Sequence, residues 1–353
     1  MTEPYADFFR GKNVLLTGHT GFVGSWLTLA LLHLGARVTG YSLDPPTSPN
    51  LFNQLRLTDR VHDIRGDVRD LGKLKASVAS ARPDIVFHLA AQALVRESYR
   101  NPVYTYETNV VGTANVLESC RASPTIRSLV VVTSDKCYAP AKDDIPHNED
   151  DRLGGRDPYS SSKACEEIVA QAYAESFLTR QGTSLATARA GNILGAGDWS
   201  AERLIPDCIR ALRAQTPIIL RNPDATRPWQ NVLDAVHGYL LLAKALHAKG
   251  PEYVGAWNFG PAAQPRYTVR MLTERVIAVW GSGSYVVNPD TQMPESMELT
   301  LNSSKSRRHL GWAPVVDLDS TIAEAVRWYS RYFSGEAIPE EVESELLSPL
   351  FKP

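Results

Sequence analysis

Three consecutive polar residues follow an apolar run and could do acid–base chemistry. The run SLVVVT is followed at once by Ser134, Asp135 and Lys136. Polar residues after a strand usually belong to a solvated turn. If another layer of the protein covers this strand end, however, such groups are tolerated only when they are paired or used. The run therefore has two interpretations, and other residues must decide between them.

A tyrosine and a lysine four residues apart form a second candidate pair. Tyr159 and Lys163 lie in DPYSSSKACEEIVA, whose helical spacing places both side chains on one face. The pKa of an isolated tyrosine is about 10, and a nearby lysine ammonium favours the phenolate. We therefore expect Tyr159 to accept a proton from a substrate hydroxyl. The same spacing also arises by chance, so its meaning depends on the rest of the chain.

A glycine-rich turn supplies that context. The segment TGHTGFVG follows a predicted strand and opens a predicted helix. Glycines in such a turn permit a tight bend and a close approach of a pyrophosphate, and the helix N-terminus attracts its charge. The pattern predicts a dinucleotide cofactor, and the residues expected to bind it here are Gly18, Thr20, Gly21, Phe22 and Gly24.

The residues after the second and third strands bear on the identity of that dinucleotide. An acid at the end of the second strand suits a free ribose 2'-hydroxyl, whereas an arginine suits a 2'-phosphate. The strand ends in Tyr-Ser-Leu followed by Asp44, without an arginine at its tip. We therefore favour NAD over NADP. Asp67 and Val68 follow the third strand and either reach the adenine or form a surface turn.

The order of apolar strands and helices predicts the fold that carries these residues. Strands are expected at residues 13–17, 36–43, 61–67, 83–91, 128–134 and 183–192, and helices at 25–35, 70–81, 104–122, 160–181 and 203–215. This alternation predicts an α/β fold, a doubly wound parallel Rossmann sheet with a smaller, mostly C-terminal α/β lobe. We assign residues 1–189 and roughly 223–262 to the dinucleotide-binding domain, and 190–222 and 263–353 to the substrate lobe.

The composition excludes several other classes of protein. The chain has 353 residues, of which 22% are charged, and a net charge of −2, so we expect neither nucleic acid nor a membrane surface as a partner. No apolar stretch approaches the roughly 20 residues of a spanning helix, and no signal peptide is evident, so we expect a cytoplasmic protein. The cysteines and histidines lack metal-binding spacing, so we expect no metal site.

Together these motifs resemble the extended short-chain dehydrogenase/reductase family over nearly the whole chain. TGHTGFVG is similar to the family's glycine motif, HLAA to its nicotinamide-side loop and YSSSK to its Tyr-Lys motif. The resemblance implies that Leu89, Ala90 and Ala91 contact the cofactor, as do Tyr159 and Lys163. It also implies that a nucleoside-diphosphate sugar is the substrate and that Asn192, Arg203 and Arg227 bind it.

Within that family, the residues after the fifth strand imply the reaction. An acid and a base beside the hydroxyl are typical of sugar dehydratases, and TSDKCY and RLGGRDPYSSSKACEE look most like the branch that acts on CDP-glucose. The implied catalytic residues are Ser134, Asp135, Lys136, Tyr159 and Lys163. Alternatives on the same fold are an epimerase, a reductase, or a dehydratase of dTDP- or GDP-sugars; a silent NAD-sensing protein would lack the Tyr-Lys pair, which is present.

The expected roles impose a geometric condition on the strand end. We expect Tyr159, assisted by Ser134, to deprotonate the C4 hydroxyl, Lys136 to remove the C5 proton and Asp135 to protonate the departing C6 hydroxyl. Consecutive residues of a strand point to opposite faces. The backbone must therefore leave strand geometry at Ser134 if all three groups are to face one sugar.

The resemblance also implies an assembly and a pathway. The helices predicted at residues 104–122 and 160–181 occupy positions that pair between subunits in the family, which implies a homodimer or homotetramer; packing on the sheet is the alternative interpretation. The implied pathway makes deoxysugars for a surface polysaccharide such as the lipopolysaccharide O-antigen.

Overall fold

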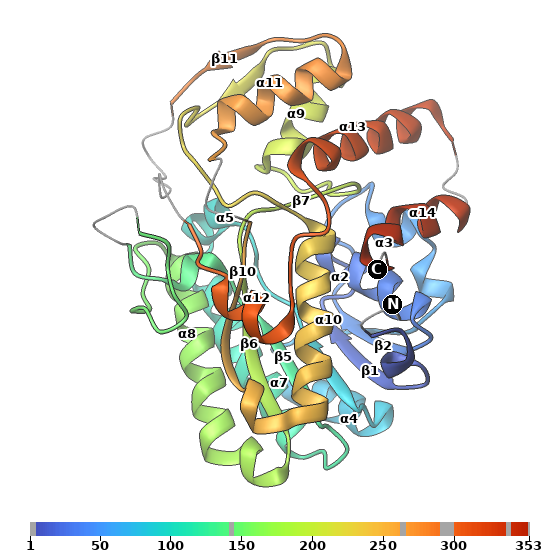
Figure 1. Ribbon diagram of the computed structural model, residues 1–353, viewed down its shortest axis with the longest axis vertical. Helices are drawn as coiled ribbons and strands as arrows, with labels where there is room; N and C mark the ends of the chain where they lie inside the picture. The colour runs from blue at the N-terminus through green and yellow to red at the C-terminus, as the bar shows by residue number, and fades with distance from the viewer. Residues whose placement is uncertain (1–4, 141–144, 262–265, 290–299, 337–339, 352–353) are drawn as a thin grey trace.

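The computed structural model describes residues 5–140, 145–261, 266–289, 300–336 and 340–351. Its centre is a parallel sheet of seven strands in the order β10-β6-β5-β4-β1-β2-β3 (Figure 1). The strands are β1 (Asn13–Thr17), β2 (Arg37–Ser42), β3 (His62–Arg65), β4 (Ile85–His88), β5 (Ser128–Val132), β6 (Ser184–Ala190) and β10 (Gly255–Phe259). The doubly wound parallel α/β fold predicted from the sequence is confirmed.

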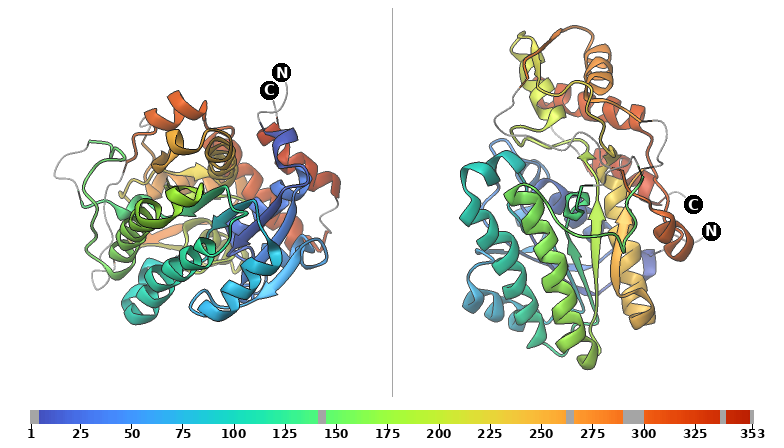
Figure 2. Two further views of the ribbon diagram at one scale, coloured as in Figure 1. Left: turned by 90° about the horizontal axis from the view of Figure 1, so that it is seen from below. Right: turned by 90° about the vertical axis from the view of Figure 1, so that its left-hand side faces the viewer.

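Helices cover both faces of this sheet. On one face lie α2 (Phe22–His33) and α10 (Val232–Lys249), and on the other lie α4 (Leu71–Ala81), α7 (Gly112–Arg121) and α8 (Pro158–Tyr173) (Figures 1 and 2). Successive strand residues point to opposite faces, so Leu16 joins the core beneath α2 and α10, whereas Leu15 joins the core beneath α4 and α7. Burial on both faces explains why the central strands β1, β4 and β5 are largely apolar.

A second group of elements lies beyond the carboxyl ends of the strands. It comprises α9 (Leu204–Arg213), β8 (Ile218–Leu220), α11 (Val269–Trp280), β11 (Tyr285–Val287) and α13 (Leu318–Ser334), which occupy the upper part of Figure 1. β8 pairs in parallel with β11, and the two-residue strands β7 (Ile193–Leu194) and β9 (Gln230–Asn231) form a further small sheet. This group caps the edge where the candidate residues collect.

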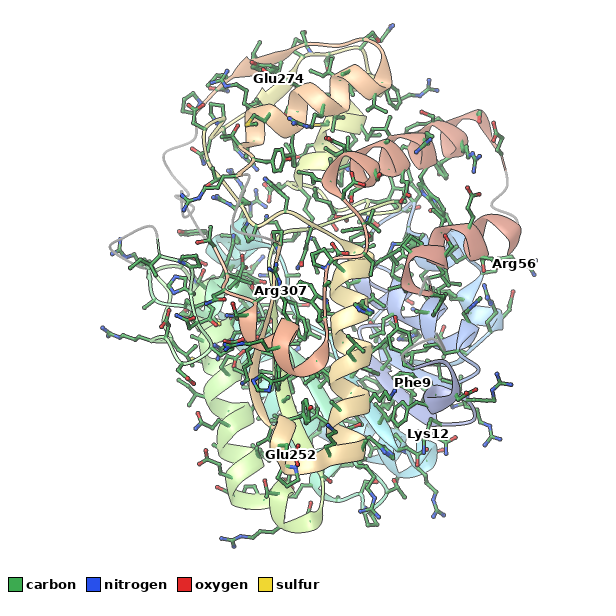
Figure 3. The ribbon with its side chains drawn as sticks, in the orientation of Figure 1. Phe9, Lys12, Arg56, Glu252, Glu274 and Arg307 are labelled. Carbon is green, nitrogen blue, oxygen red and sulfur yellow. The ribbon has the colours of Figure 1, made fainter. Side chains whose placement is uncertain are left out.

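The C-terminal segments return toward the sheet. α12 (Ser304–Leu310) contacts β10, and α14 (Glu340–Phe351) contacts α10 and the short helix α1 (Ala6–Phe9) at the opposite end of the chain. The hydroxyl of Tyr5 donates to the carbonyl of Leu350 (3.1 Å). Phe9 is fully buried, whereas Arg56 extends into solvent (Figure 3). The expected lobe boundary between residues 262 and 263 lies within residues 262–265, which are outside the described residues.

The remaining helices connect these layers. They are α3 (Leu51–Gln54), α5 (Val95–Arg100) and α6 (Pro102–Tyr106), and α6 continues through a π-helical turn (Glu107–Val111) into α7. None of the described helices is long and apolar enough to cross a membrane.

Candidate active site

The turn between β1 and α2 is built around close backbone approaches that only glycine permits. Gly18 has a φ of +78°, and a Cβ atom there would lie 2.7 Å from the backbone nitrogen of Ala90. A Cβ atom on Gly24 would lie 2.0 Å from the carbonyl oxygen of Gly18. A Cβ atom on Gly21 would meet no atom nearer than 3.4 Å. Gly21 precedes α2, and no side chain caps the N-terminus of this helix. A pyrophosphate therefore fits against this turn.

Two threonines connect the turn to the neighbouring strands by hydrogen bonds. The Thr20 hydroxyl donates to the carbonyl of Leu43 (3.0 Å) and shares a hydrogen bond with Ser42 (2.8 Å). Thr17 at the end of β1 accepts hydrogen bonds from the backbone nitrogens of Leu89 (3.2 Å) and Ala90 (3.3 Å). The glycine turn is thus tied to the ends of both β2 and β4.

The backbone leaves strand geometry at the expected place after β5. The strand ends at Val132, and a 3₁₀ turn begins at Asp135 with Ser134 as its N-cap. The backbone nitrogen of Lys136 donates to the Ser134 hydroxyl oxygen (3.2 Å). Because of this turn, Ser134, Asp135 and Lys136 all line one cavity of about 320 Å³.

Asp135 is buried and its environment favours the neutral acid. Its Oδ1 accepts a hydrogen bond from the Ser134 hydroxyl (3.0 Å), whereas its Oδ2 has no partner among the described residues. Burial raises the pKa of Asp135, although the positive charges of Lys136 and Arg227 oppose the shift. A protonated carboxyl group facing the cavity can act as a general acid.

Tyr159 and Lys163 project from α8 into the same cavity. The helix begins with Asp157 as its N-cap, which accepts a hydrogen bond from the backbone nitrogen of Ser160 (2.9 Å). Nζ of Lys163 lies 6.0 Å from the centre of the Tyr159 ring, and Ser134 hydrogen-bonds to the phenol. The Ser134 hydroxyl therefore connects Asp135 with Tyr159.

Lys163 favours the Tyr159 phenolate, as the sequence predicts, but burial of the phenol opposes it. Burial raises the pKa of Tyr159, and the charge of Lys163 and the hydrogen bond with Ser134 offset this only in part. Desolvation, which the charges in the sequence do not report, disfavours the charged phenolate. Without further positive charge in the cavity, Tyr159 carries its proton.

Three predicted substrate residues line the same cavity: Asn192, Arg203 and Arg227. Arg203 precedes α9 and lies 3.8 Å from Asp198. The charge of Arg203 acts on Tyr159, and that of Arg227 acts on Asp135. Both guanidinium groups therefore lie close to the candidate catalytic residues, where they can pair with phosphate oxygens.

Of the residues predicted at the cofactor, Leu89, Ala91, Tyr159 and Lys163 line the cavity, while the others lie outside its lining. Asp44 has a 91% exposed side chain and forms a 3.8 Å ion pair with Arg65. Asp67 is held by Arg69 (2.7 Å), which lowers the pKa of Asp67. Val68 is buried, and a Cβ atom on Gly112 would lie 2.7 Å from its side chain.

An arginine near the tip of β2 escaped the sequence argument. Arg65 comes from β3, yet it donates to the carbonyl of Leu43 (3.2 Å) beside Asp44. The choice of NAD over NADP was based on the residues that follow β2 in the chain. Arg65 belongs to β3, and parallel pairing of the two strands brings it opposite Ser42. The adjacency could be found only by pairing the two strands.

A buried ionic network behind the catalytic turn was also missed. Arg189 on β6 donates to Glu167 on α8 (2.7 Å) and to the hydroxyl of Tyr138 (2.7 Å), and Thr187 also donates to Glu167 (2.6 Å). Glu166, the residue before Glu167, pairs instead with Lys163. The sequence signal that could have revealed this network is the presence of charged residues, Glu167 and Arg189, on elements that were predicted to be buried. Among the described residues, no cluster of three metal-ligating side chains occurs.

Comparison with known proteins places this geometry among nucleotide-sugar enzymes. Residues 15–325 match the model of a family described as GDP-mannose 4,6 dehydratase. A CDP-glucose 4,6-dehydratase from Salmonella typhimurium is 43% identical over 336 residues, which cover 94% of each chain.

Solved structures agree with this relationship. A dTDP-glucose 4,6-dehydratase from Streptomyces venezuelae with NAD bound has a TM-score of 0.79 and 26% identity, covering 92% of this chain and 98% of its own. An epimerase from Methanothermobacter thermautotrophicus has a TM-score of 0.82 and 23% identity, covering 94% and 96%. The latter likeness bears on the fold alone.

Proposed function

The chain belongs to the family described as GDP-mannose 4,6 dehydratase, and on this premise we propose that it is an NAD-dependent hydro-lyase that converts CDP-D-glucose to CDP-4-dehydro-6-deoxy-D-glucose. The observation that carries the reaction is the convergence of Ser134, Asp135, Lys136 and Tyr159 on one cavity. The choice of CDP-glucose is supported by the 43% identity to an enzyme of that name.

The cofactor site fits a dinucleotide. The open side of Gly21 and the uncapped N-terminus of α2 would hold the pyrophosphate, and Leu89, Ala91 and Lys163 would adjoin the nicotinamide end. When bound, NAD supplies a hydride acceptor and later a hydride donor at the sugar. A positively charged nicotinamide in the cavity would also favour the Tyr159 phenolate, which burial alone disfavours.

The first step requires a base at the C4 hydroxyl. Tyr159 accepts that proton, and the Ser134 hydroxyl, which hydrogen-bonds to the phenol, orients it. Lys163 stabilises the phenolate from the same helix face. The product of this step is a 4-ketone, which makes the proton on C5 more acidic.

The second step requires a base and an acid at adjacent carbons. Lys136 takes the C5 proton and Asp135, whose pKa is raised by burial, gives a proton to the departing C6 hydroxyl. The 3₁₀ turn places these two groups on consecutive residues facing the same cavity. Arg203, Arg227 and Asn192 hold the diphosphate, so that the hexose lies beside the catalytic turn.

Incubation with nucleotide sugars tests the function. Mass spectrometry of CDP-glucose treated with enzyme and NAD should show the loss of one water molecule, while thermal-shift measurements with CDP-, dTDP-, GDP- and UDP-glucose should give the largest stabilisation with CDP-glucose. An epimerase would leave the mass unchanged. If only another nucleotide sugar lost water, the proposed substrate would be wrong, but the proposed dehydration would still hold.

We also propose that the enzyme is a homodimer or a dimer of dimers through α6, α7 and α8. Apolar side chains on these helices and the π-helical turns that follow α6 and α8 are exposed: Val103 (68%), Tyr106 (38%), Val111 (50%), Ile168 (57%) and Phe177 (42%). A cluster of exposed apolar groups is typical of a subunit interface. The implied symmetric pairing would bury these helices against a second copy.

Changing two of these side chains to acids tests the assembly. The double variant Val111→Asp, Ile168→Asp should be a monomer in light scattering, because a buried interface would force like charges together without partners. The matched control Val287→Asp, at an exposed position of β11, should keep the wild-type mass. A wild-type protein that is already monomeric would contradict the proposal.

We also assign dinucleotide binding to the sheet and its helices. We assign nucleotide-sugar binding mainly to the elements beyond the carboxyl edge of the sheet, which line much of the cavity. The four cysteines are free thiols, which suits the reducing cytoplasm. The keto-deoxy product would then feed the synthesis of deoxysugars for surface polysaccharide.

A further inference from the structure

Glu166 is a buried carboxylate that no step of the proposed reaction uses. It lies one helical turn after Lys163 on α8, and its Oε1 and Oε2 are 2.9 and 3.0 Å from Nζ of that lysine. Glu166 is 2% exposed, as is Lys163. Two charges so deeply buried are tolerated because each compensates the other.

The neighbouring Glu167 has a different set of partners. Its carboxylate accepts hydrogen bonds from Arg189 (2.7 Å), Thr187 (2.6 Å) and Thr133. The charge of Glu167 is therefore matched by Arg189, on the side of β6. Among the described residues, Glu166 is the carboxylate paired directly with the catalytic lysine.

We propose that Glu166 is a positioning residue that holds the Lys163 ammonium in place. As a result, the Tyr159–Lys163 pair loses a proton only at a higher pH than it would without Glu166. Lys163 lies between the two groups, with its ammonium bound to Glu166 and 6.0 Å from the centre of the Tyr159 ring. The negative charge of Glu166 reduces the positive field that Tyr159 receives. The inference rests on the proposed function in so far as Tyr159 is the group that accepts the substrate proton.

The electrostatics of the cluster agree with this geometry. Burial raises the pKa of Glu166 to about 7, although the Lys163 ammonium opposes the shift. Burial alone would lower the pKa of Lys163, yet Glu166, Tyr159 and Glu167 together raise it. The negative charge of Glu166 also adds to the rise in the pKa of Tyr159.

Other titratable groups also face this cluster from the surrounding elements. They are His88 on β4, Glu167 on α8, Arg189 on β6, Arg203 before α9 and Tyr239 on α10. Burial lowers the pKa of His88 to about 3 and raises that of Tyr239, so both are neutral near pH 7. Glu167 and Arg189 compensate each other. Arg203 favours the Tyr159 phenolate.

The isosteric substitution Glu166→Gln removes this negative charge. We expect the low-pH limb of kcat/KM for the nucleotide sugar to move down by about one pH unit, so that below the midpoint the variant is about tenfold more active relative to its own plateau. We also expect the tyrosinate absorbance of the ligand-free enzyme, taken as the difference from the Tyr159→Phe form of the same variant, to appear at a lower pH.

Two further variants separate this role from a merely structural one. Glu166→Asp keeps the charge and should retain both wild-type midpoints, and Glu175→Gln, which removes an exposed glutamate bonded to Gln171 (2.8 Å), should do the same. Unchanged midpoints in Glu166→Gln, or the same shift in Glu175→Gln, would overturn the inference. A lower tyrosinate midpoint in a protein that transforms no nucleotide sugar would leave it standing and overturn the proposed function.

Discussion

The Lys136→Met variant should bind CDP-glucose with nearly unchanged affinity and fail to exchange the C5 hydrogen of the sugar with solvent. Methionine keeps the unbranched stem that lines the cavity and removes the amine that would take the C5 proton. Loss of a general base lowers the rate of a proton transfer by roughly a hundredfold to ten-thousandfold. The measurement is deuterium incorporation at C5 in heavy water, with the dissociation constant determined in parallel.

A lysine on the far side of the protein provides the control for this variant. Lys75 on α4 pairs with Glu118 at the surface (3.6 Å), and Lys75→Met should exchange deuterium at the wild-type rate. Because oxidation at C4 precedes proton removal, Lys136→Met should still reduce the bound cofactor when sugar is added. Wild-type exchange at C5 in Lys136→Met would refute its role as the base.

The Asp135→Asn variant should show the opposite pattern. The amide has nearly the shape of the carboxyl group and can keep the contact with Ser134 (3.0 Å), but it cannot supply an acidic proton to the C6 hydroxyl. We expect loss of water to slow by roughly a hundredfold to ten-thousandfold while C5 exchange continues. Mass spectrometry of the product and deuterium incorporation at C5 measure the two events separately.

The pH dependence of the elimination step provides a second readout for Asp135. Burial raises the pKa of this carboxyl group, so the acid form persists to a higher pH than in an ordinary aspartate. The wild-type elimination rate should fall as the pH rises through that raised pKa, and Asp135→Asn should lack this fall. Asp319→Asn, at an exposed position of α13, should retain it. Wild-type elimination by Asp135→Asn would exclude Asp135 as the acid.

The sequence predicted the sheet well because its strands are buried on both faces. The predicted strands that became β1, β4 and β5 are continuous apolar runs, and such runs are typical of parallel sheets. The edge strand β10 (GAWNF) was missed; it contains a glycine and an asparagine and follows the long helix α10 and a 3₁₀ turn. Its place beside β6 depends on pairing between residues about 70 positions apart, which local patterns do not report.

The candidate site was predictable where a motif places several groups on one element. Tyr159 and Lys163 share a helix face, and the departure from strand geometry at Ser134 follows from the requirement that three consecutive groups face one sugar. The protonation state of those groups could not be predicted from the same motifs. The pairing of Lys163 with Glu166 and the desolvation of Tyr159 depend on packing in three dimensions, and the effect of burial on a pKa opposes that of the neighbouring charge.

The short 3₁₀ turn after β5 has a consequence for how such enzymes can diverge. Asp135 and Lys136 lie outside the strand, so substitutions at these positions leave the buried faces of the sheet untouched. A new outcome at the sugar can therefore arise by changing a few side chains that line the cavity, without altering the strands that build the sheet. This separation of scaffold from chemistry would allow one ancestral architecture to give rise to enzymes with different products.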